Sequence, residues 1–222
     1  IINFCKQIGY KGYTELRLSV AENLSTHLER IMDDVKIDDN MPDIIDKVFR
    51  ANINALRDTL KYLDRTQVAG AMQLIRNAKK VLIFGIGPSA LVAQDAYSRF
   101  LRIGIPVQFA GDPLIMRMEA KSLDDRCAAI AVSYAGRTED TVYTARSAKE
   151  TGAKVICLSS FDSTPLAEVS DIRLIAYTHE TKVFREATAS RLAQLAIIDA
   201  LYTGIALADY DNTRIKLDEE EK

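Results

Sequence analysis

The pattern of apolar residues changes at about residue 80 of the chain. Before that point, apolar residues recur at helical spacing from Ile44 to Leu63 and again from Val68 to Ile75, which predicts two helices with one buried face each. After it, short apolar runs, some of them continuous, alternate with helix-period segments. The runs predict five strands, at Val81–Phe84, Pro106–Phe109, Ala128–Val132, Val155–Leu158 and Ile172–Tyr177. Continuous apolar strands are typical of a parallel sheet that is covered on both faces.

The segments between these strands complete the pattern of an α/β protein. Helices are predicted at Leu91–Leu101, Asp112–Ser122, Thr141–Thr151 and Leu166–Val169, with a longer one from about Arg185 to Ala208. Alternating strands and helices predict a three-layer αβα sandwich with a five-stranded, mostly parallel sheet. We expect this domain to span residues 43–210, followed by an acidic tail at 211–222 that frays at its end.

The N-terminal part of the chain has a different organisation. Residues 1–26 hold two short helical segments around the turn Gly9-Tyr10-Lys11-Gly12-Tyr13. Residues 27–42 are polar, contain two acidic pairs and close with Met41-Pro42, which predicts a linker. Because the chain begins with Ile1 rather than Met, we expect it to be a fragment of a longer protein.

Composition narrows the classes of function. The chain has 222 residues and a net charge of −2, so it has no bulk attraction to nucleic acid or acidic membranes. The cysteines Cys5, Cys127 and Cys157 are far apart, and no metal-ligand spacing or signal peptide is present, which favours a reducing cytoplasm. The longest apolar tract, Leu192–Ala208, is interrupted by Gln194 and Asp199. It predicts a buried or subunit-facing helix rather than a membrane span.

Two strands end in loops that carry small and hydroxyl residues. Val81–Phe84 leads into Gly85-Ile86-Gly87-Pro88-Ser89, and Ala128–Val132 leads into Ser133-Tyr134-Ala135-Gly136-Arg137-Thr138. Each loop precedes a predicted helix, and helix N-termini at the carboxyl edge of a parallel sheet attract phosphate groups. The hydroxyls of Ser89, Ser133 and Thr138, the backbone around Gly136 and the charge of Arg137 predict one anion site. The alternative is that Ser89 and Thr138 are only helix caps.

Other nucleotide and cofactor sites are excluded by the same loops. The first loop lacks the third glycine of a dinucleotide fingerprint, since residue 90 is Ala. No Gly-Lys-Ser/Thr sequence follows it, so it is not a P-loop either. Because metal-ligand spacing is absent as well, we predict no cofactor and no metal.

These motifs resemble the sugar isomerase (SIS) domain. The resemblance rests on both loops and on Ser163-Thr164-Pro165-Leu166-Ala167 ahead of Asp171. It implies a phosphosugar ligand and a dimer or tetramer. The family loop commonly reads Ser-x-Ser-Gly-x-Thr, so Ala135 stands where a second serine is usual. The residues that the resemblance assigns to the effector site are Gly87, Ser89, Ser133, Tyr134, Ala135, Gly136, Arg137, Thr138 and Glu186.

The N-terminus resembles the end of the helix-turn-helix domain of RpiR-type transcriptional regulators. Its sequence, Asn3-Phe4-Cys5-Lys6 followed by Gly9-Tyr10-Lys11-Gly12-Tyr13, is similar to the close of that family's recognition helix, with Asn3 where arginine is common. Asn3, Lys6 and Lys11 would be the remnant of the DNA-binding surface. Because the start of the recognition helix is absent, we expect this fragment to bind DNA weakly or not at all.

The resemblance leaves two functions open, because SIS domains occur in regulators and in enzymes. The first is a cytoplasmic transcriptional regulator of carbohydrate metabolism, without enzyme activity, whose DNA binding responds to a phosphosugar. The second is a phosphosugar isomerase, which needs a general base such as Glu186 or His179. The N-terminal resemblance favours the regulator.

Overall fold

The computed structural model describes residues 2–7, 10–17, 35–178 and 188–220. The chain divides into two compact units, residues 1–51 with 180–186 and residues 52–179 with 187–222. In the first unit, α1 spans Ile2–Gln7, and residues 13–17 are also helical. The long helix α3, Met41–Tyr62, begins there and ends in the second unit.

Helix α3 starts inside the stretch that was predicted as linker. Asn40 accepts a hydrogen bond from the Asp43 N–H at 3.0 Å, and Pro42 lies in the first turn, where a missing N–H costs nothing. The helix therefore begins at Met41, three residues before Ile44, the first apolar residue of its pattern. At its other end, the Thr59 hydroxyl donates to the Tyr177 carbonyl at 3.3 Å.

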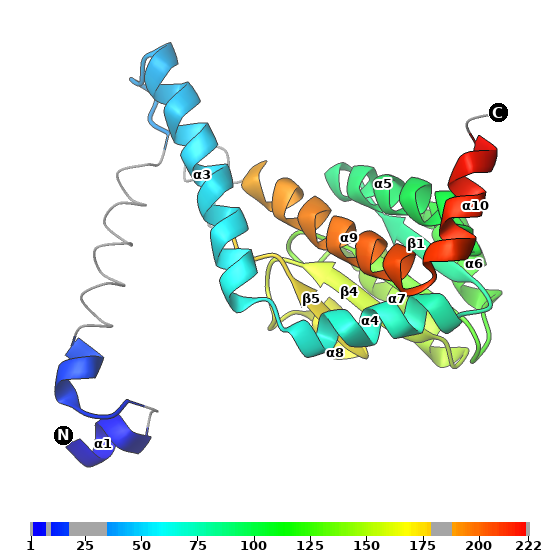
Figure 1. Cartoon of the computed structure of the whole chain (residues 1–222), viewed down its shortest axis with the longest axis horizontal. Coiled ribbons are helices and arrows are strands. Elements are labelled where there is room, and N and C mark those ends of the chain that lie inside the picture. The colour runs from blue at the N-terminus through cyan, green and yellow to red at the C-terminus, as the bar shows by residue number, and fades with distance from the viewer. Residues whose placement is uncertain (1, 8–9, 18–34, 179–187, 221–222) are drawn as a thin grey trace. The chain divides into compact units, whose positions relative to one another are not determined.

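The second unit is the predicted α/β sandwich, with a sheet that is parallel throughout (Figure 1). Its strands are β1 Val81–Gly85, β2 Val107–Ala110, β3 Ala128–Val132, β4 Lys154–Ser159 and β5 Ile172–Ile175. Strand positions agree with the apolar runs, except that β5 ends two residues before Tyr177. The strand order is β2-β1-β3-β4-β5, so the chain changes direction across the sheet between β1 and β3.

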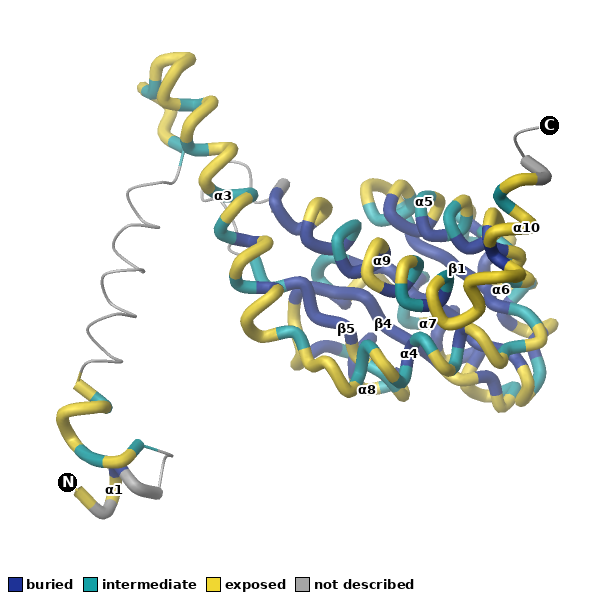
Figure 2. Tube along the Cα trace, in the orientation of Figure 1, coloured by how far each residue is buried: buried dark blue, intermediate teal, exposed yellow. Residues whose placement is uncertain are grey.

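Helices cover both faces of this sheet. Those in the second unit, in addition to α3, are α4 Arg65–Asn77, α5 Pro88–Arg102, α6 Pro113–Lys121, α7 Glu139–Glu150, α8 Pro165–Val169, α9 Thr188–Ala208 and α10 Tyr210–Glu220. One core lies between the sheet and α4, α5 and α9, and the other between the sheet and α6, α7 and α8. The central strands β1 and β3 are fully buried between these layers, and β4 is buried after its first residue, as the dark tube of the sheet in Figure 2 shows. Burial on both faces explains the continuous apolar sequences of these three strands.

The apolar helix α9 belongs to the first of these cores. Residues 189–208 are long and apolar enough to cross a membrane by length and composition, with a mean hydropathy of 1.3. Within the fold, however, Ala193, Ile197, Ile198 and Leu201 are buried in the core, and α9 packs against α4 and α5. Its hydrophobicity therefore has an explanation in the packing of the domain.

Most of the predicted acidic tail is helical, in α10, and its last two residues, 221–222, lie outside the described part of the chain. Helix α10 packs against α9 and α5. Thr213 is buried, and the Lys216 ammonium donates to the Ile103 carbonyl at 3.4 Å. The sequence pattern did not reveal this helix because its hydrophobic residues are few and do not form a stripe.

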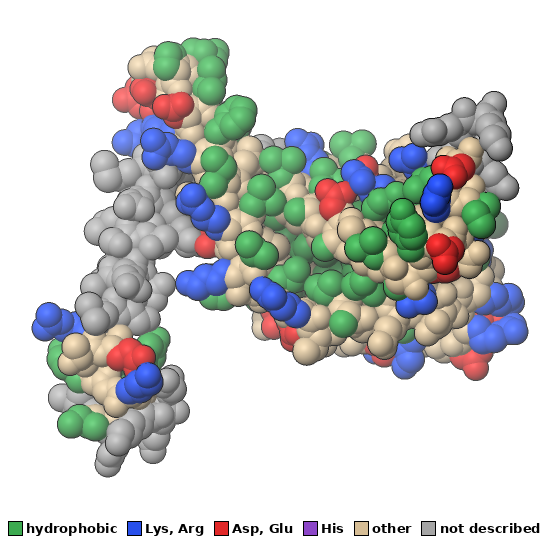
Figure 3. Space-filling model, viewed as in Figure 1, with side chains coloured by type: hydrophobic (Ala, Val, Ile, Leu, Met, Phe, Trp, Pro, Cys, Tyr) green, Lys and Arg blue, Asp and Glu red, His purple; other side chains and the backbone are tan. Residues whose placement is uncertain are grey.

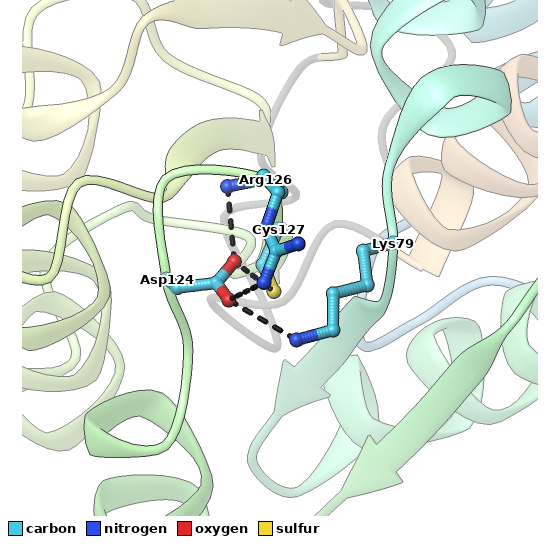
Figure 4. A network of polar contacts seen from close by, with 4 residues as sticks. All are labelled: Lys79, Asp124, Arg126 and Cys127. Atoms are coloured by element: carbon cyan, nitrogen blue, oxygen red, sulfur yellow. Dashed lines mark hydrogen bonds and ion pairs between the residues drawn. The ribbon is translucent and has the colours of Figure 1, made fainter.

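At the amino-terminal edge of the sheet, Asp124 ties the starts of β1 and β3 together (Figure 4). Its carboxylate accepts from the Lys79 ammonium at 3.1 Å, the Arg126 guanidinium at 2.9 Å and the Cys127 thiol at 3.2 Å. The hydrogen bonds from Arg126, Cys127 and Lys79 hold the pKa of Asp124 well below its usual range. Cys127 is thus a buried thiol, and so are Cys5 and Cys157.

This network generates a prediction about pH and stability. Because the pKa of Asp124 is lowered in the folded state, its ionised carboxylate stabilises the fold at pH values above the unfolded-state pKa of 3.8. This stabilisation is lost as the pH falls from 3.8 toward the folded-state pKa. Wild type should therefore unfold at higher urea than Asp124→Asn at pH 7, and the difference should narrow at pH 3. The neighbouring exposed Asp125→Asn is the control; an equal effect of both variants would contradict the assignment.

A second anchor supports the loop that follows β3. Gly136 has a φ of +63°, and a Cβ on it would lie 2.4 Å from the Thr164 hydroxyl oxygen. Thr164 is held in place because its hydroxyl caps α8 by accepting from the Ala167 N–H at 3.2 Å. The structure shows a second reason for glycine at this position, because the absence of a side chain lets Thr164 approach.

Replacement of Gly136 should therefore be more costly than replacement of Gly87. Both residues have positive φ, but nothing lies within 4 Å of a Cβ placed on Gly87. We expect Gly136→Ala to lower the free energy of unfolding by about 2–4 kcal/mol, from backbone strain plus overpacking, and Gly87→Ala by about 1–2 kcal/mol, from strain alone. Urea denaturation measures both values. Equal losses would show that the contact with Thr164 does not matter.

Candidate functional site

The two hydroxyl-bearing loops meet at the carboxyl edge of the sheet. Strands β1 and β3 are direct neighbours, with Gly85 opposite Val132, so the loops that follow them emerge side by side. The Ser89 hydroxyl oxygen accepts from the Tyr134 N–H at 3.4 Å, which links one loop to the other. This is also the point where the strand order reverses, the usual position of a ligand in an open parallel sheet.

Ser133 and Thr138 lie together within the second loop. Their hydroxyl oxygens are 3.4 Å apart, and the Ser133 oxygen also accepts from the Gly136 N–H at 3.2 Å. Ser133 is buried, whereas Thr138 is exposed. Ser133 therefore lies in the interior of the loop, and Thr138 lies at its surface.

The hydroxyls are not used as helix caps. The cap position of α5 is Gly87, and Ser89 follows one residue inside the helix. Thr138 does occupy the cap position of α7, but its side chain makes no capping hydrogen bond. By contrast, Asp64, Asp112 and Thr164 cap α4, α6 and α8 through their side chains.

The start of α7 also has a run of backbone donors without acceptors. Among the described protein atoms, no acceptor is present for the N–H groups of residues 137–141. Such groups, with the positive end of the helix dipole, bind anions. Two uncapped helix starts that converge at one sheet edge, with three hydroxyls between them, can hold a phosphate group.

The charge around these loops is mixed, because the exposed Glu139 also lies in the first turn of α7. Arg137 is exposed and has no ion-pair partner within the described part of the chain. Asp140, in the first turn of α7, is paired instead with Arg117 of α6, and this guanidinium also lies 4.9 Å from the centre of the Tyr143 ring. The pairing neutralises a carboxylate that would otherwise oppose an anion.

The loop after β4 adds residues that the sequence analysis missed. The Ser160 N–H donates to the Tyr134 carbonyl at 2.9 Å, and the Phe161 ring meets the Tyr134 ring edge to face at 5.6 Å. The signal was present in the sequence, because Ser159 and Ser160 follow an apolar strand just as Ser133 does.

Other predicted site residues are placed less fully. Ala135 is half-buried in the second loop. Glu186 and His179 lie outside the described residues, so the proposed bases of an isomerase have no observed geometry. Asn3 and Lys6 belong to α1, and Lys11 is exposed in the turn that follows; its N–H donates to the Glu15 carboxylate.

A surface cavity elsewhere suits a phosphate poorly. It has a volume of about 310 Å³ and is lined by Tyr97, Val107, Gln108 and Phe109, at the edge strand β2. None of these lining residues is charged. No group of three or more His, Cys, Asp or Glu residues that could hold a metal ion occurs in the described segments.

Comparisons with known proteins agree with this architecture. Residues 74–204 match the SIS domain model. HexR of Escherichia coli, an HTH-type transcriptional regulator, is 32% identical over 204 residues, which cover 92% of this chain and 70% of HexR. RpiR of the same organism is 25% identical over 217 residues, which cover 98% of this chain and 73% of RpiR.

A solved structure extends the likeness over the full chain. NanR of Vibrio vulnificus, complexed with ManNAc-6P, superposes with a TM-score of 0.75 at 25% identity, covering 100% of this chain and 78% of NanR. Matches of this extent to the domain model and to the regulators identify the family. The chain belongs to the RpiR-type HTH transcriptional regulators, and residues 74–204 are its SIS domain.

Proposed function

We propose that this chain senses a phosphosugar and that the ligand regulates DNA binding by the protein. The phosphate would lie between the starts of α5 and α7, where the hydroxyls of Ser89, Ser133 and Thr138 and the N–H groups of residues 137–141 donate to its oxygens. The observation that carries the proposal is the pair of uncapped helix starts joined by the hydrogen bond between Ser89 and Tyr134. The phosphosugar in the NanR complex supports the same class of ligand.

The remaining loop residues would have supporting parts in this site. Gly87 leaves open space where a side chain would otherwise stand, Gly136 shapes the second loop, and Arg137 supplies positive charge. Ala135 contributes no hydroxyl, so its backbone N–H is the only donor that it offers. Glu186 would contact the sugar.

The protein is proposed to regulate rather than to catalyse. Curated relatives bear the names of transcriptional regulators, although the SIS fold is shared with a putative sugar-phosphate isomerase. The phosphosugar would then act as an effector and would dissociate from the protein chemically unchanged. Sustained interconversion of aldose and ketose phosphates by the purified protein would contradict this part of the proposal.

Regulation would work through the packing of identical subunits in the cytoplasm. Helix α3 exposes an apolar stripe at helical spacing, visible among its hydrophobic side chains in Figure 3. The stripe comprises Ile45, Val48, Phe49, Ile53, Leu56 and Leu60. Exposed apolar stripes of this kind mark protein interfaces. A phosphosugar that binds one subunit arrangement more tightly would favour that arrangement and so reposition the DNA-binding parts.

The N-terminal segment is assigned to DNA binding on the same basis. Residues 1–26 would be the end of the helix-turn-helix domain, with Asn3, Lys6 and Lys11 on its DNA-facing side. Residues 27–42 would connect it to the effector domain.

Two hydroxyl deletions test the effector site. Ser133→Ala and Thr138→Ala each remove a neutral donor to a charged phosphate, so each should weaken phosphosugar binding by about 1.5–3 kcal/mol. Thr138→Ala should leave the free energy of unfolding nearly unchanged, because the hydroxyl does not cap α7. Ser133→Ala should lower it by ~1 kcal/mol, because the Gly136 N–H loses its acceptor. Calorimetric titration with a panel of phosphosugars measures the affinities.

The matched control is Ser122→Ala. Its hydroxyl donates to the Glu119 carbonyl at the end of α6, at the opposite edge of the sheet, so phosphosugar affinity should not change. If both site variants bind every phosphosugar as tightly as wild type does, the site has been assigned wrongly.

A further inference from the structure

A small cluster of buried polar side chains lies beside the candidate site. Ser160, which follows β4, and Ser190 in α9 are 7% and 1% exposed, and Gln194, one turn further along α9, is 2% exposed. The hydroxyl oxygens of Ser160 and Ser190 are 2.7 Å apart. Since the Ser160 N–H donates to the Tyr134 carbonyl, the cluster is joined directly to the loop that starts α7.

Gln194 has an unpaired donor in this cluster. It lies one helical turn after Ser190, on the same face of α9, among residues that form the apolar core. Its side-chain nitrogen is buried and has no hydrogen-bond partner among the residues that the structure describes. A buried amide without a partner destabilises the fold relative to an apolar side chain of the same size. The residue therefore has a structural cost that packing does not explain.

The hydroxyl pair has spare hydrogen-bonding capacity as well. One O–H group is used between Ser160 and Ser190, which leaves the second proton and several lone pairs available. Gln194 adds two N–H donors. Oxygen atoms of a carbohydrate, which both donate and accept, match this combination of groups.

We propose that Gln194, together with Ser160 and Ser190, binds hydroxyl or carbonyl oxygens of the sugar part of the effector. The proposal rests on the phosphosugar function above and assigns a binding site to the sugar end of the same ligand. The helix starts would bind the phosphate, which all phosphosugars share. The buried cluster would distinguish a phosphosugar from phosphate alone.

The test replaces Gln194 with methionine, which keeps the length of the side chain and removes the amide. Affinities are measured calorimetrically for inorganic phosphate, glucose 6-phosphate, fructose 6-phosphate, arabinose 5-phosphate and N-acetylmannosamine 6-phosphate. For the sugar phosphate that wild type binds most tightly, Gln194→Met should weaken binding about tenfold, with no change for inorganic phosphate. Without ligand, the variant should melt at the same or a higher temperature than wild type.

Thr144→Val is the matched control, because Thr144 also has a buried, unpaired hydroxyl but packs on the other side of the sheet, in α7. Thr144→Val should change neither the affinity for inorganic phosphate nor the affinity for the sugar phosphate. Ser190→Ala is the second variant and should weaken sugar phosphate binding selectively, in the same sense as Gln194→Met.

Three outcomes would overturn the inference. If wild type binds a sugar phosphate and Gln194→Met binds it equally well, the inference fails while the proposed function stands. If Gln194→Met weakens binding of phosphate and sugar phosphate by the same factor, its role is structural. If wild type binds none of the five compounds, the inference and the proposed function fail together.

Discussion

The parallel pairing of β1 with β3 is the constraint on which this structure depends. It sets Gly85 beside Val132 at the point where the strand order reverses. Two helices therefore begin next to each other, although about fifty residues separate them in the sequence. The unpaired N–H groups at the start of α7 and the positive dipole ends of both helices therefore lie at one place, which neither helix could achieve alone.

The same close backbone contacts hold the fold together and shape the candidate site. A Cβ on Gly85 would lie 2.9 Å from the Ser89 carbonyl and 3.0 Å from the Val132 carbonyl, so only glycine lets α5 start this near to β3. On the other side, Thr164 fills the space beside Gly136 and caps α8. The donors are thus fixed before any ligand arrives, which reduces the entropy lost on binding.

Much of this arrangement could be predicted from the sequence, because local residue patterns mark the positions of the strands and of the loops that follow them. The apolar runs located all five strands, and the hydroxyl residues after Val81–Phe84 and Ala128–Val132 located the loops. The strand order could not be read, because pairing depends on packing between distant segments. The role of Gly136 depended on Thr164, and helix α10 was missed because its contacts with α5 and α9 are tertiary. Gln194 was noticed only as an interruption of an apolar tract, yet its polarity there was the signal.

The central claim is that one anion is held jointly by the starts of α5 and α7. Backbone amide chemical shifts, followed by NMR during titration with inorganic phosphate, test it most directly. The account predicts that the largest changes fall on Ser89, Ala90 and residues 136–141, with a common dissociation constant for both segments. Changes confined to one of the two segments, or centred on the β2 residues Val107–Phe109, would contradict it.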